Sequence, residues 1–424
     1  MFLISIMLSL VYFICAIFIN INWINDIACY FGYGLSIYLV LFIALIPGFI
    51  FIFMFISLLC NKKEKRVDIK KEEDVTILIP VYNAKKSIKE TIESIRKQKY
   101  CGDIFVNIID DGSTDGSFEF LESMSLDSKI RLLKSDHKGK AYALNDALQY
   151  VKTDYTITVD SDTVFHPLAV RNIMRKLVNS DKKTAATAGC LFAKNAKKNF
   201  ITKLQEWDYT LGIFGVKLYQ GNYNSTLVAQ GAFSAYKTKL LKQIGGWQNC
   251  VGEDIVLTWQ LLSQGYETNF AKNAIAFTEV PETFASLGRQ RKRWARGMIE
   301  AFKRVKIITS KKLDFKSKFL MCLNVLFPFI DFALLIFVPL GLGLLVFGNQ
   351  LLIGWLSLFV VLLGMLLCLI IEIKRKNMLR EIECKLERRS ICAFIFYVLL
   401  YAFILAPYCL AGYISELINS KKEW

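Results

Sequence analysis

Asp160 and Asp162 have the residue type and the spacing of a metal-binding pair. They directly follow the apolar run 155–159, and on an extended chain two side chains that are two residues apart point the same way. Carboxylate oxygens of this kind suit Mg²⁺ or Mn²⁺, which hold a diphosphate and keep several of their own waters. A solvated turn is the alternative role of such a pattern.

A second acidic pair, Asp110 and Asp111, follows the apolar run 104–109. Acids at strand ends of nucleotide-binding folds accept hydrogen bonds from a base N–H or a ribose hydroxyl. An Asx turn with Gly112 is the alternative. Lys140 opens a helical pattern further along, where a lysine can meet phosphate with help from the helix dipole.

Glu253 and Asp254 open another helical pattern, over residues 255–262. An acid at a helix start serves as an N-cap, and this role suits Glu253. Asp254 is the better candidate for a general base that takes a proton from an attacking hydroxyl. The chain has two histidines, His137 and His166, and neither lies in the acidic motifs. A histidine base is therefore not indicated.

The segment from Gln290 to Gly297 combines an amide, arginines and an indole. If it is helical, Gln290, Arg293, Trp294 and Gly297 share one face. Such a face can hold a sugar and a phosphate together, because Trp stacks on sugar rings and Arg forks onto phosphate oxygens. A basic amphipathic helix on a lipid surface is the alternative.

Apolar runs and helical patterns alternate around these motifs. The run 75–81 precedes Tyr82-Asn83 and a helical pattern, just as the runs 104–109 and 155–159 precede the acidic loops. Alternating strands and helices favour an α/β, mostly parallel sheet, which binds its ligands at the carboxyl ends of the strands. All three polar loops are expected at such ends.

The composition predicts a membrane protein with one globular domain. The 424 residues are 54% hydrophobic, and the mean hydropathy is +0.36. Residues 1–60 contain no Lys or Arg and hold two apolar stretches, 2–21 and 35–60. Each exceeds the roughly 20 residues that a spanning helix needs. The first lacks a basic segment and a cleavage site, so we interpret it as a retained anchor.

Basic residues after the second stretch place the middle of the chain in the cytosol, with 22–34 facing outward. They are Lys62, Lys63, Lys65 and Arg66. Further spans are expected near 319–347, 350–372 and 391–417, although Pro407 could make the last one re-entrant. The expected organisation is two spanning helices in 1–60, a cytosolic domain in 67–317 with an interfacial amphipathic helix at about 284–306, and two or three spanning helices in 318–417.

The net charge of +16 is concentrated at membrane flanks, where anionic lipid is a simpler partner than nucleic acid. No nucleic-acid partner is expected. The 11 cysteines contain no Cys-x-x-Cys pair, so the sequence indicates neither a zinc site nor a disulfide framework.

Taken in order, the motifs resemble those of the processive family 2 glycosyltransferases, and most closely the bacterial poly-N-acetylglucosamine synthases of biofilms, with hyaluronan synthases next. The resemblance covers about 75–300 in motifs and the whole chain in membrane layout. The motifs are Ile79-Pro80-Val81-Tyr82-Asn83, Asp110-Asp111-Gly112-Ser113, Lys138-Gly139-Lys140-Ala141, Asp160-Ser161-Asp162, Gly252-Glu253-Asp254 and Gln290-x-x-Arg293-Trp294.

The resemblance implies a GT-A fold that binds a UDP-sugar with Mg²⁺ or Mn²⁺ in the bacterial cytoplasmic (inner) membrane. Carried over to matching positions, Asn83, Asp110 and Asp111 would contact the nucleotide. Lys140 would contact the diphosphate, and Asp160 and Asp162 the ribose and metal. Asp254 would be the base, with Glu253 beside it, and Gln290, Arg293 and Trp294 would meet the acceptor sugar and the diphosphate.

The partners that the resemblance implies are a UDP-sugar donor, with UDP-N-acetylglucosamine expected, a growing polysaccharide acceptor, membrane lipid and a small membrane accessory subunit. Two positions depart from the family pattern. Ala84 stands where many members have Glu, and Gly252 replaces the usual Thr, as in hyaluronan synthases. A hyaluronan- or cellulose-type synthase, and a non-processive transferase acting on a lipid carrier, are the alternatives.

Overall fold

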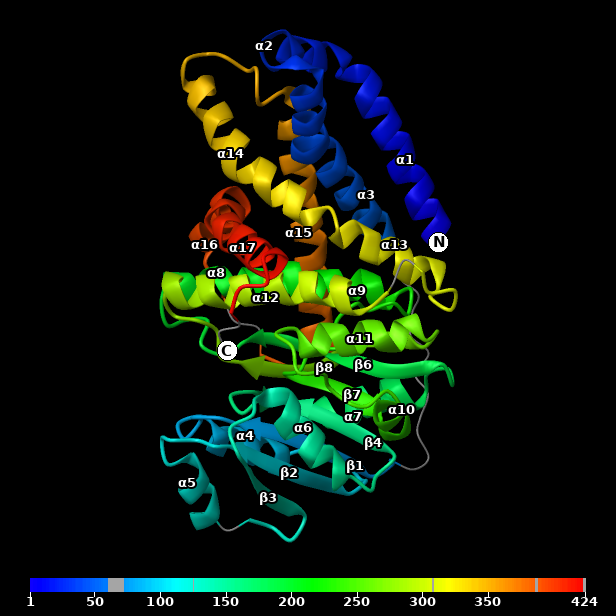
Figure 1. Ribbon diagram of the computed structural model, residues 1–424, viewed down its shortest axis with the longest axis vertical. Helices are drawn as coiled ribbons and strands as arrows, with labels where there is room; N and C mark the ends of the chain where they lie inside the picture. Colours follow the sequence, from blue (N-terminus) through cyan, green and yellow to red (C-terminus); the bar gives the residue numbers. More distant parts are fainter. Residues whose placement is uncertain (60–71, 125, 307–308, 386–387, 422–424) are drawn as a thin grey trace.

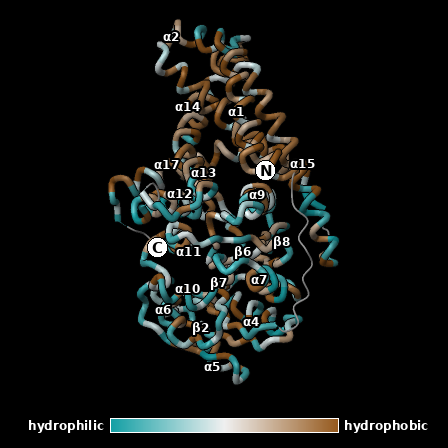
Figure 2. The backbone as a smooth tube through the Cα atoms, turned by 90° about the vertical axis from the view of Figure 1, so that its right-hand side faces the viewer, coloured by the Kyte–Doolittle hydropathy of each residue, from teal (hydrophilic) through white to brown (hydrophobic). Residues whose placement is uncertain are grey.

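The computed structural model of the chain describes residues 1–59, 72–124, 126–306, 309–385 and 388–421. Figure 1 shows a layered α/β domain at one end of the molecule and a bundle of long helices at the other. In Figure 2 the backbone of the bundle is hydrophobic over most of its length, whereas both kinds of residue mix in the α/β domain.

A mixed, mostly parallel sheet forms the centre of the α/β domain. Its strands are β1 (Val75–Val81), β2 (Ile104–Asp111), β3 (Ile130–Ser135), β4 (Tyr155–Val159), β5 (Val164–Phe165), β6 (Thr184–Ala193), β7 (Phe233–Lys237) and β8 (Glu267–Thr278). The order is β3-β2-β1-β4-β7-β6-β8-β5. Strands β3, β2, β1 and β4 are parallel to one another, as are β6 and β8. β7 runs antiparallel to β4 and β6, and β5 to β8.

Helices cover both faces of this sheet. They are α4 (Ile88–Arg96), α5 (Ser117–Ser123), α6 (Lys140–Gln149), α7 (Ala169–Val178), α8 (Phe200–Asp208), the π-helix η2 (Tyr209–Gly215), α9 (Val216–Gly221), α10 (Thr238–Gln243), α11 (Glu253–Ser263) and α12 (Phe284–Arg304). Ile77 and Ile79 of β1 pack with α4 and α7. Leu78, between them, packs with α6 and α11 on the opposite face, as the alternation of a strand requires.

The predicted fold class is confirmed. β1 and β4 have the bounds of the apolar runs 75–81 and 155–159, and β2 extends two residues beyond its run to include Asp110 and Asp111. The helices expected from Ile88 and from Lys140 are present as α4 and α6.

The bundle contains the apolar helices. They are α1 (Phe2–Ile19), α2 (Ile21–Val40), η1 (Leu41–Leu45), α3 (Ile46–Leu59), α13 (Phe315–Asn324), α14 (Phe327–Val346), α15 (Trp355–Glu381), α16 (Ile391–Phe396), η3 (Tyr397–Tyr401) and α17 (Ala402–Leu417). Within the described residues, five helical stretches are long and apolar enough to cross a membrane: Phe2–Ile19, Ile21–Leu59, Phe315–Val346, Trp355–Glu381 and Ile391–Leu417.

The connection expected at 22–34 is itself helical. It belongs to α2, whose backbone breaks at Gly32, where φ is 77°. This positive φ suits glycine, which lacks a Cβ. The basic residues Lys62, Lys63, Lys65 and Arg66 lie outside the described residues, so the side of the membrane on which the α/β domain lies stays a prediction.

The last apolar segment takes an unusual position. In Figures 1 and 2, α16 and α17 lie at the level of α12, at the lower end of α14, and do not reach the loop that joins α14 to α15. α17 packs along α12 and against α14. The re-entrant interpretation of Pro407, which lies inside α17, stays a prediction.

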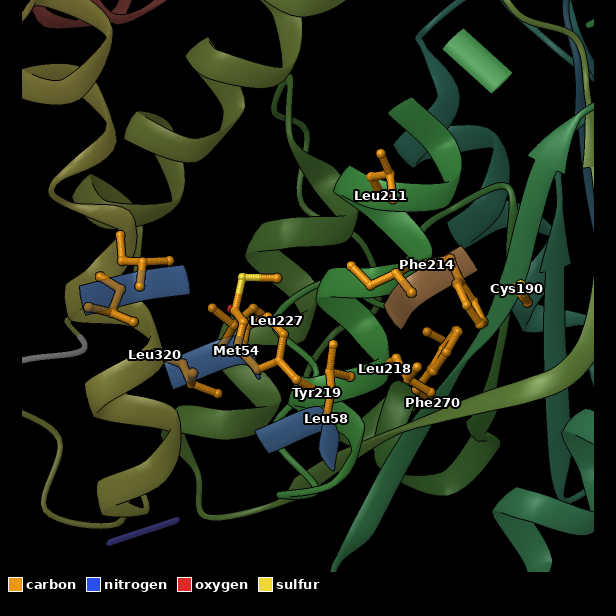
Figure 3. Close-up of a cluster of buried hydrophobic side chains, with 14 of the residues drawn as sticks. Met54, Leu58, Cys190, Leu211, Phe214, Leu218, Tyr219, Leu227, Phe270 and Leu320 are labelled. Atoms are coloured by element: carbon orange, nitrogen blue, oxygen red, sulfur yellow. The ribbon is translucent and has the colours of Figure 1, made fainter. Parts of the chain in front are cut away.

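A shared hydrophobic core joins the bundle to the α/β domain. Figure 3 shows Met54 and Leu58 of α3 close to Tyr219 of α9 and Leu320 of α13. The same core continues through Leu218 and Phe214 to Phe270 of β8. Because these side chains are buried together, the sheet is anchored to the membrane helices by packing as well as by chain connections.

Two basic residues of α12 are held by protein. A basic helix on a lipid surface would turn Arg296 and Lys303 toward headgroups, yet Arg296 is buried and its Nε lies 2.9 Å from Oε2 of Glu416 in α17. Lys303 also donates to the Glu416 backbone carbonyl and lies 3.5 Å from its carboxylate. One face of α12 therefore meets protein rather than lipid.

Replacement of Glu416 by Gln should destabilise the fold. The side chains of Arg296 and Glu416 are each 7% exposed, and breaking a buried ion pair costs about 3 kcal/mol or more, because a charge is left unpaired. We expect a lower midpoint of thermal unfolding in detergent. Glu381→Gln, at an exposed position at the end of α15, is the control. An unchanged midpoint for Glu416→Gln would show that α17 does not hold α12.

Candidate active site

Three strands bring the polar loops to one edge of the sheet. β1 and β2 are parallel, with Val81 paired to Asp110, and β4 is parallel to β1. Asn83 and Asp160 lie in the loops after β1 and β4, and Asp111 is the last residue of β2, so residues far apart in the sequence lie at neighbouring strand ends.

Lys140 links two of the acidic motifs. Its Nζ lies 2.5 Å from Oδ1 of Asp160 and 3.6 Å from Oε1 of Glu253. Burial alone would lower the pKa of Lys140, but the two carboxylates outweigh burial and raise it. The lysine therefore stays charged and holds the start of α6, the end of β4 and the start of α11 together.

Glu253 is not the helix cap that its position suggested. The N-cap of α11 is Gly252, and no side chain caps this helix. Burial raises the pKa of Glu253 to about 7, partly offset by the ammonium of Lys140, while Asp254 raises it further. Glu253 is thus a buried partner of Lys140, poised to gain a proton near neutral pH.

Asp162 lies beside Asp160 in a buried setting. Its Oδ1 accepts hydrogen bonds from the hydroxyls of Thr278 at 3.1 Å and Thr163 at 3.3 Å. Burial raises the pKa of Asp162 to about 6, and the negative charge of Asp160 adds to this effect.

The two aspartates fit a divalent cation. A buried carboxylate with a raised pKa, such as that of Asp162, gains from a nearby cation, which favours its charged form. Within the described residues no group of three or more His, Cys, Asp or Glu could hold a metal ion. Two carboxylates therefore suit an ion such as Mg²⁺, which takes its remaining ligands from water and substrate phosphates.

Asp254 is held in a fixed orientation at the start of α11. Its Oδ2 accepts from the backbone N–H of Gly231 at 3.2 Å, and its Oδ1 from that of Ile255 at 2.8 Å. The turn at Gly231 therefore contacts the candidate base directly.

Two glycines bring α12 against the start of α11. A Cβ at Gly297 would lie 2.9 Å from Cα of Gly252 and 3.1 Å from its backbone N. Real Cβ atoms essentially never approach backbone that closely. The small residue at each position lets α12 pack next to Glu253 and Asp254.

Gly297→Ala should reduce turnover at least about tenfold, because the added methyl must push α12 away from the start of α11. The overpacking should also cost about 1 to 3 kcal/mol of stability. Initial rates and the thermal unfolding midpoint measure the two effects. Gly343→Ala in α14, where an added Cβ meets nothing within 4 Å, is the matched control. Equal rates for both variants would contradict the role of this contact.

The predicted face of α12 is only partly open. Arg293 is exposed and Trp294 is 37% exposed, so both can meet a ligand. Gln290 is half-buried, and its Oε1 has no hydrogen-bond partner among the described residues. An unsatisfied buried acceptor is unusual and suits a site that a ligand completes.

Arg291 carries a role that the motif pattern did not reveal. It is buried, its Nη2 lies 2.5 Å from Oδ2 of Asp208 in α8, and its guanidinium lies 4.1 Å from the ring centroid of Trp294. Tyr401 of η3 donates to the same Asp208 oxygen at 3.3 Å. Arg291 of the same helix, held by residues of α8 and η3, therefore supports the ring of Trp294 from its inner side.

The carboxylates of Asp110 and Asp111, at the end of β2, form hydrogen bonds with nearby backbone N–H groups. The carboxylate of Asp111 accepts the backbone N–H groups of Lys138 and Gly139, both at 3.0 Å. Asp110 accepts the Ser113 N–H at 3.0 Å, while its other oxygen is buried with no hydrogen-bond partner in the part of the chain that the structure describes. The structure thus gives Asp111 a loop-shaping role and leaves one Asp110 oxygen available.

Asn83 shapes the same edge. It has φ of 52°, and its Oδ1 accepts the backbone N–H of Thr114 at 2.8 Å. Beside it, the rings of Tyr82 and His137 stack with centroids 4.3 Å apart and an interplanar angle of 17°. This pairing was not predicted, because it joins segments that are far apart in the chain.

Comparison with known proteins gives a consistent result. A family model described as "Glycosyltransferase like family 2" matches residues 73–297. A poly-beta-1,6-N-acetyl-D-glucosamine synthase of Staphylococcus aureus (strain COL) is 28% identical over 263 residues, or 62% of this chain and 63% of that protein. The synthase of Staphylococcus epidermidis is 27% identical over 243 residues, 57% of each chain. The match thus spans less than two thirds of these relatives.

Among solved structures, a mannosyltransferase of Pyrobaculum calidifontis in complex with GDP-Man and Mn²⁺ superposes with a TM-score of 0.61. It is 18% identical and covers 94% of this chain and 99% of its own. This likeness supports the GT-A fold. Because the family model covers more than half of the 424 residues, the chain belongs to glycosyltransferase family 2.

Proposed function

We propose that this enzyme is a processive, inverting transferase that polymerises UDP-N-acetylglucosamine into an exported polysaccharide of the poly-β-1,6-N-acetylglucosamine type. The supporting relatives are named as synthases of that polymer. The observation that carries the proposal is the packing of α12 against the start of α11, which brings the exposed Arg293 and Trp294 to the helix that begins with Glu253 and Asp254.

In this mechanism Asp254 takes the proton from the hydroxyl of the terminal acceptor sugar. The Gly231 and Ile255 N–H groups hold its carboxylate in place while that oxygen attacks the anomeric carbon. Lys140 and Arg293 stabilise the charge that grows on the leaving UDP diphosphate. A divalent cation bound at Asp160 and Asp162 would add Lewis-acid stabilisation of the same diphosphate.

The chain is also proposed to act at the cytosolic face of a bacterial inner membrane and to pass its product between its helices. The apolar bundle packs directly on the catalytic domain. Asp331 of α14 accepts a hydrogen bond from Tyr413 of α17 at 2.9 Å, so a polar pair lies between these two helices. Intramembrane polar groups normally face protein or water, which suits the wall of a path.

The proposal is tested by incubating membranes that contain the enzyme with labelled UDP-N-acetylglucosamine and, separately, UDP-glucose. Digestion of the product with linkage-specific hydrolases then identifies the bond. We expect a long polymer from UDP-N-acetylglucosamine that a β-1,6-specific hydrolase degrades. Polymer from UDP-glucose alone, or a single sugar on a lipid, would overturn it.

Trp294→Ala should lower polymer synthesis roughly five- to tenfold, because the exposed ring face offers a stacking surface of about 1 kcal/mol to the acceptor sugar. Trp294→Phe should keep most of the activity. Product length on gels and UDP release measure the two effects. A non-processive transferase that adds one sugar to a lipid carrier would tolerate Trp294→Ala, so normal UDP release by that variant would contradict processive synthesis.

A further inference from the structure

Lys217 of α9 is a buried lysine that the mechanism above does not use. It is 6% exposed, and within the described residues it has no ion pair. Its ammonium donates a hydrogen bond to the backbone carbonyl of Val228. Lysines are almost never fully buried without a partner, because desolvating an ammonium is costly. Its presence in the interior therefore calls for a physical reason.

The carbonyl that Lys217 binds belongs to the turn 227–231, whose backbone groups form hydrogen bonds with several side chains. The side chain of Gln220 accepts from the Leu227 N–H at 3.1 Å, and Trp259 donates to the Leu227 carbonyl at 3.1 Å. Thr258 accepts from the Ala229 N–H at 2.9 Å, and Tyr236 donates to the Ala229 carbonyl at 3.0 Å. Lys217 holds the carbonyl between these two residues.

This turn ends at the proposed base. Gly231 donates its N–H to Oδ2 of Asp254 at 3.2 Å, so a shift of the turn would shift the hydrogen bond that orients the carboxylate. Thr258, which holds Ala229, also donates to the Asp254 backbone carbonyl at 2.7 Å. Turn and base are thus parts of one hydrogen-bonded unit.

We propose that Lys217 is a positioning residue for Asp254: its ammonium fixes the turn 227–231 against the carboxylate, and its positive charge attracts that carboxylate. The inference rests on the proposed role of Asp254. Lys217 itself does not touch the substrate in this scheme; it acts through the Val228 carbonyl and through its charge.

The electrostatics agree with this role. Burial lowers the pKa of Lys217 to about 8, against the opposing influence of Asp254 from α11 and of the Cys190 thiol from β6. Asp254 in turn interacts electrostatically with Lys140 and Glu253, and with Tyr236 of β7. An attraction between Lys217 and Asp254 is mutual, so the ammonium also stabilises the carboxylate that must accept the proton.

A purely structural lysine would behave differently. Burying an ammonium generally costs more than leaving one carbonyl without its donor, which Lys217→Met does to Val228. Lys217→Met should therefore fold at least as stably as the wild type, and it should still be slower if Lys217 serves the reaction. Loss of activity without loss of stability separates the two roles.

The experiment compares Lys217→Met, Lys217→Gln and the control Lys239→Met, an exposed lysine of α10, as full-length enzymes in membranes. We expect kcat of Lys217→Met to fall at least tenfold, with the KM for the sugar donor within twofold and an unfolding midpoint no lower than that of the wild type. If Lys217→Met does not fold, Lys217→Gln decides, because it keeps a donor for the Val228 carbonyl without the charge.

The pH profile gives a second readout. The wild-type rate should fall as pH rises through about 8, because Lys217 then loses its charge, and the Met and Gln variants should lack this decline. A kcat within twofold of the wild type in the folded variant would overturn the inference. So would a variant in which the KM for the donor rises while kcat and stability fall together. A wild type that uses no UDP-sugar would instead refute the proposed function.

Discussion

Asp254→Asn should reduce the transferase rate on the order of a thousandfold, the range expected when a general base is removed. Asn has the shape of Asp and keeps an oxygen that can accept one of the two N–H groups, from Gly231 and Ile255, that now hold the carboxylate. The variant should therefore fold and bind the donor but fail to deprotonate the acceptor hydroxyl. Polymer formation from labelled donor, with UDP binding measured by calorimetry, tests both parts.

The control for this result is Asp146→Asn, an exposed acid on α6 of the same domain, which should leave the rate unchanged. Glu253 lies next to Asp254, so Glu253→Gln must also be measured. We expect Glu253→Gln to weaken donor binding through Lys140, whereas Asp254→Asn should leave donor binding almost unchanged. Full activity of Asp254→Asn would remove Asp254 from the role of base and would require another proton acceptor.

Local patterns account for the parts of the fold that the sequence predicted well. The runs 75–81 and 155–159 became β1 and β4 with the same bounds, because each is a short β-branched apolar segment that ends at polar residues. Lys140 and Glu253 were expected at helix starts, and α6 and α11 begin there. Strand-end placement then brought the acidic loops together, as parallel sheets require.

Tertiary contacts account for what the sequence could not give. Arg291 and Arg296 lie in one basic motif, yet their partners are Asp208 and Glu416, which are 83 and 120 residues away. Nothing in the local charge pattern distinguishes a lipid-facing arginine from one that is buried in an ion pair. The role of Lys217 was not predicted for the same reason, because its acceptor is a backbone carbonyl, and no sequence pattern identifies such an acceptor.

The opposed glycines show how a departure from the family motif can carry structural meaning. Gly252 stands where the usual residue is Thr, and the structure places it against Gly297 of α12 with no room for a Cβ. A side chain at position 252 would therefore require a different spacing between α11 and α12. The Gly252–Gly297 contact therefore sets how closely Trp294 and Arg293 approach the base.

Asp162→Asn should lower the rate at least about a hundredfold, as expected when electrostatic stabilisation of the departing diphosphate is removed. Asn keeps an Oδ1 for the hydroxyls of Thr163 and Thr278, so the local hydrogen bonds survive and only the charge is lost. If Asp162 holds a divalent cation, the variant should need a much higher Mn²⁺ concentration for half-maximal activity. Titration of activity with Mn²⁺ measures this shift.

The wild-type enzyme should also lose Mn²⁺ binding as pH falls through about 6, because protonation of Asp162, whose pKa is raised by burial and by Asp160, removes a ligand. Asp162→Asn should not show that dependence. Asp181→Asn, an exposed acid, should behave like the wild type in both measurements. If Asp162→Asn and the wild type had the same Mn²⁺ requirement, the metal would have to be held elsewhere, and Lys140 and Arg293 would carry the charge stabilisation of the diphosphate alone.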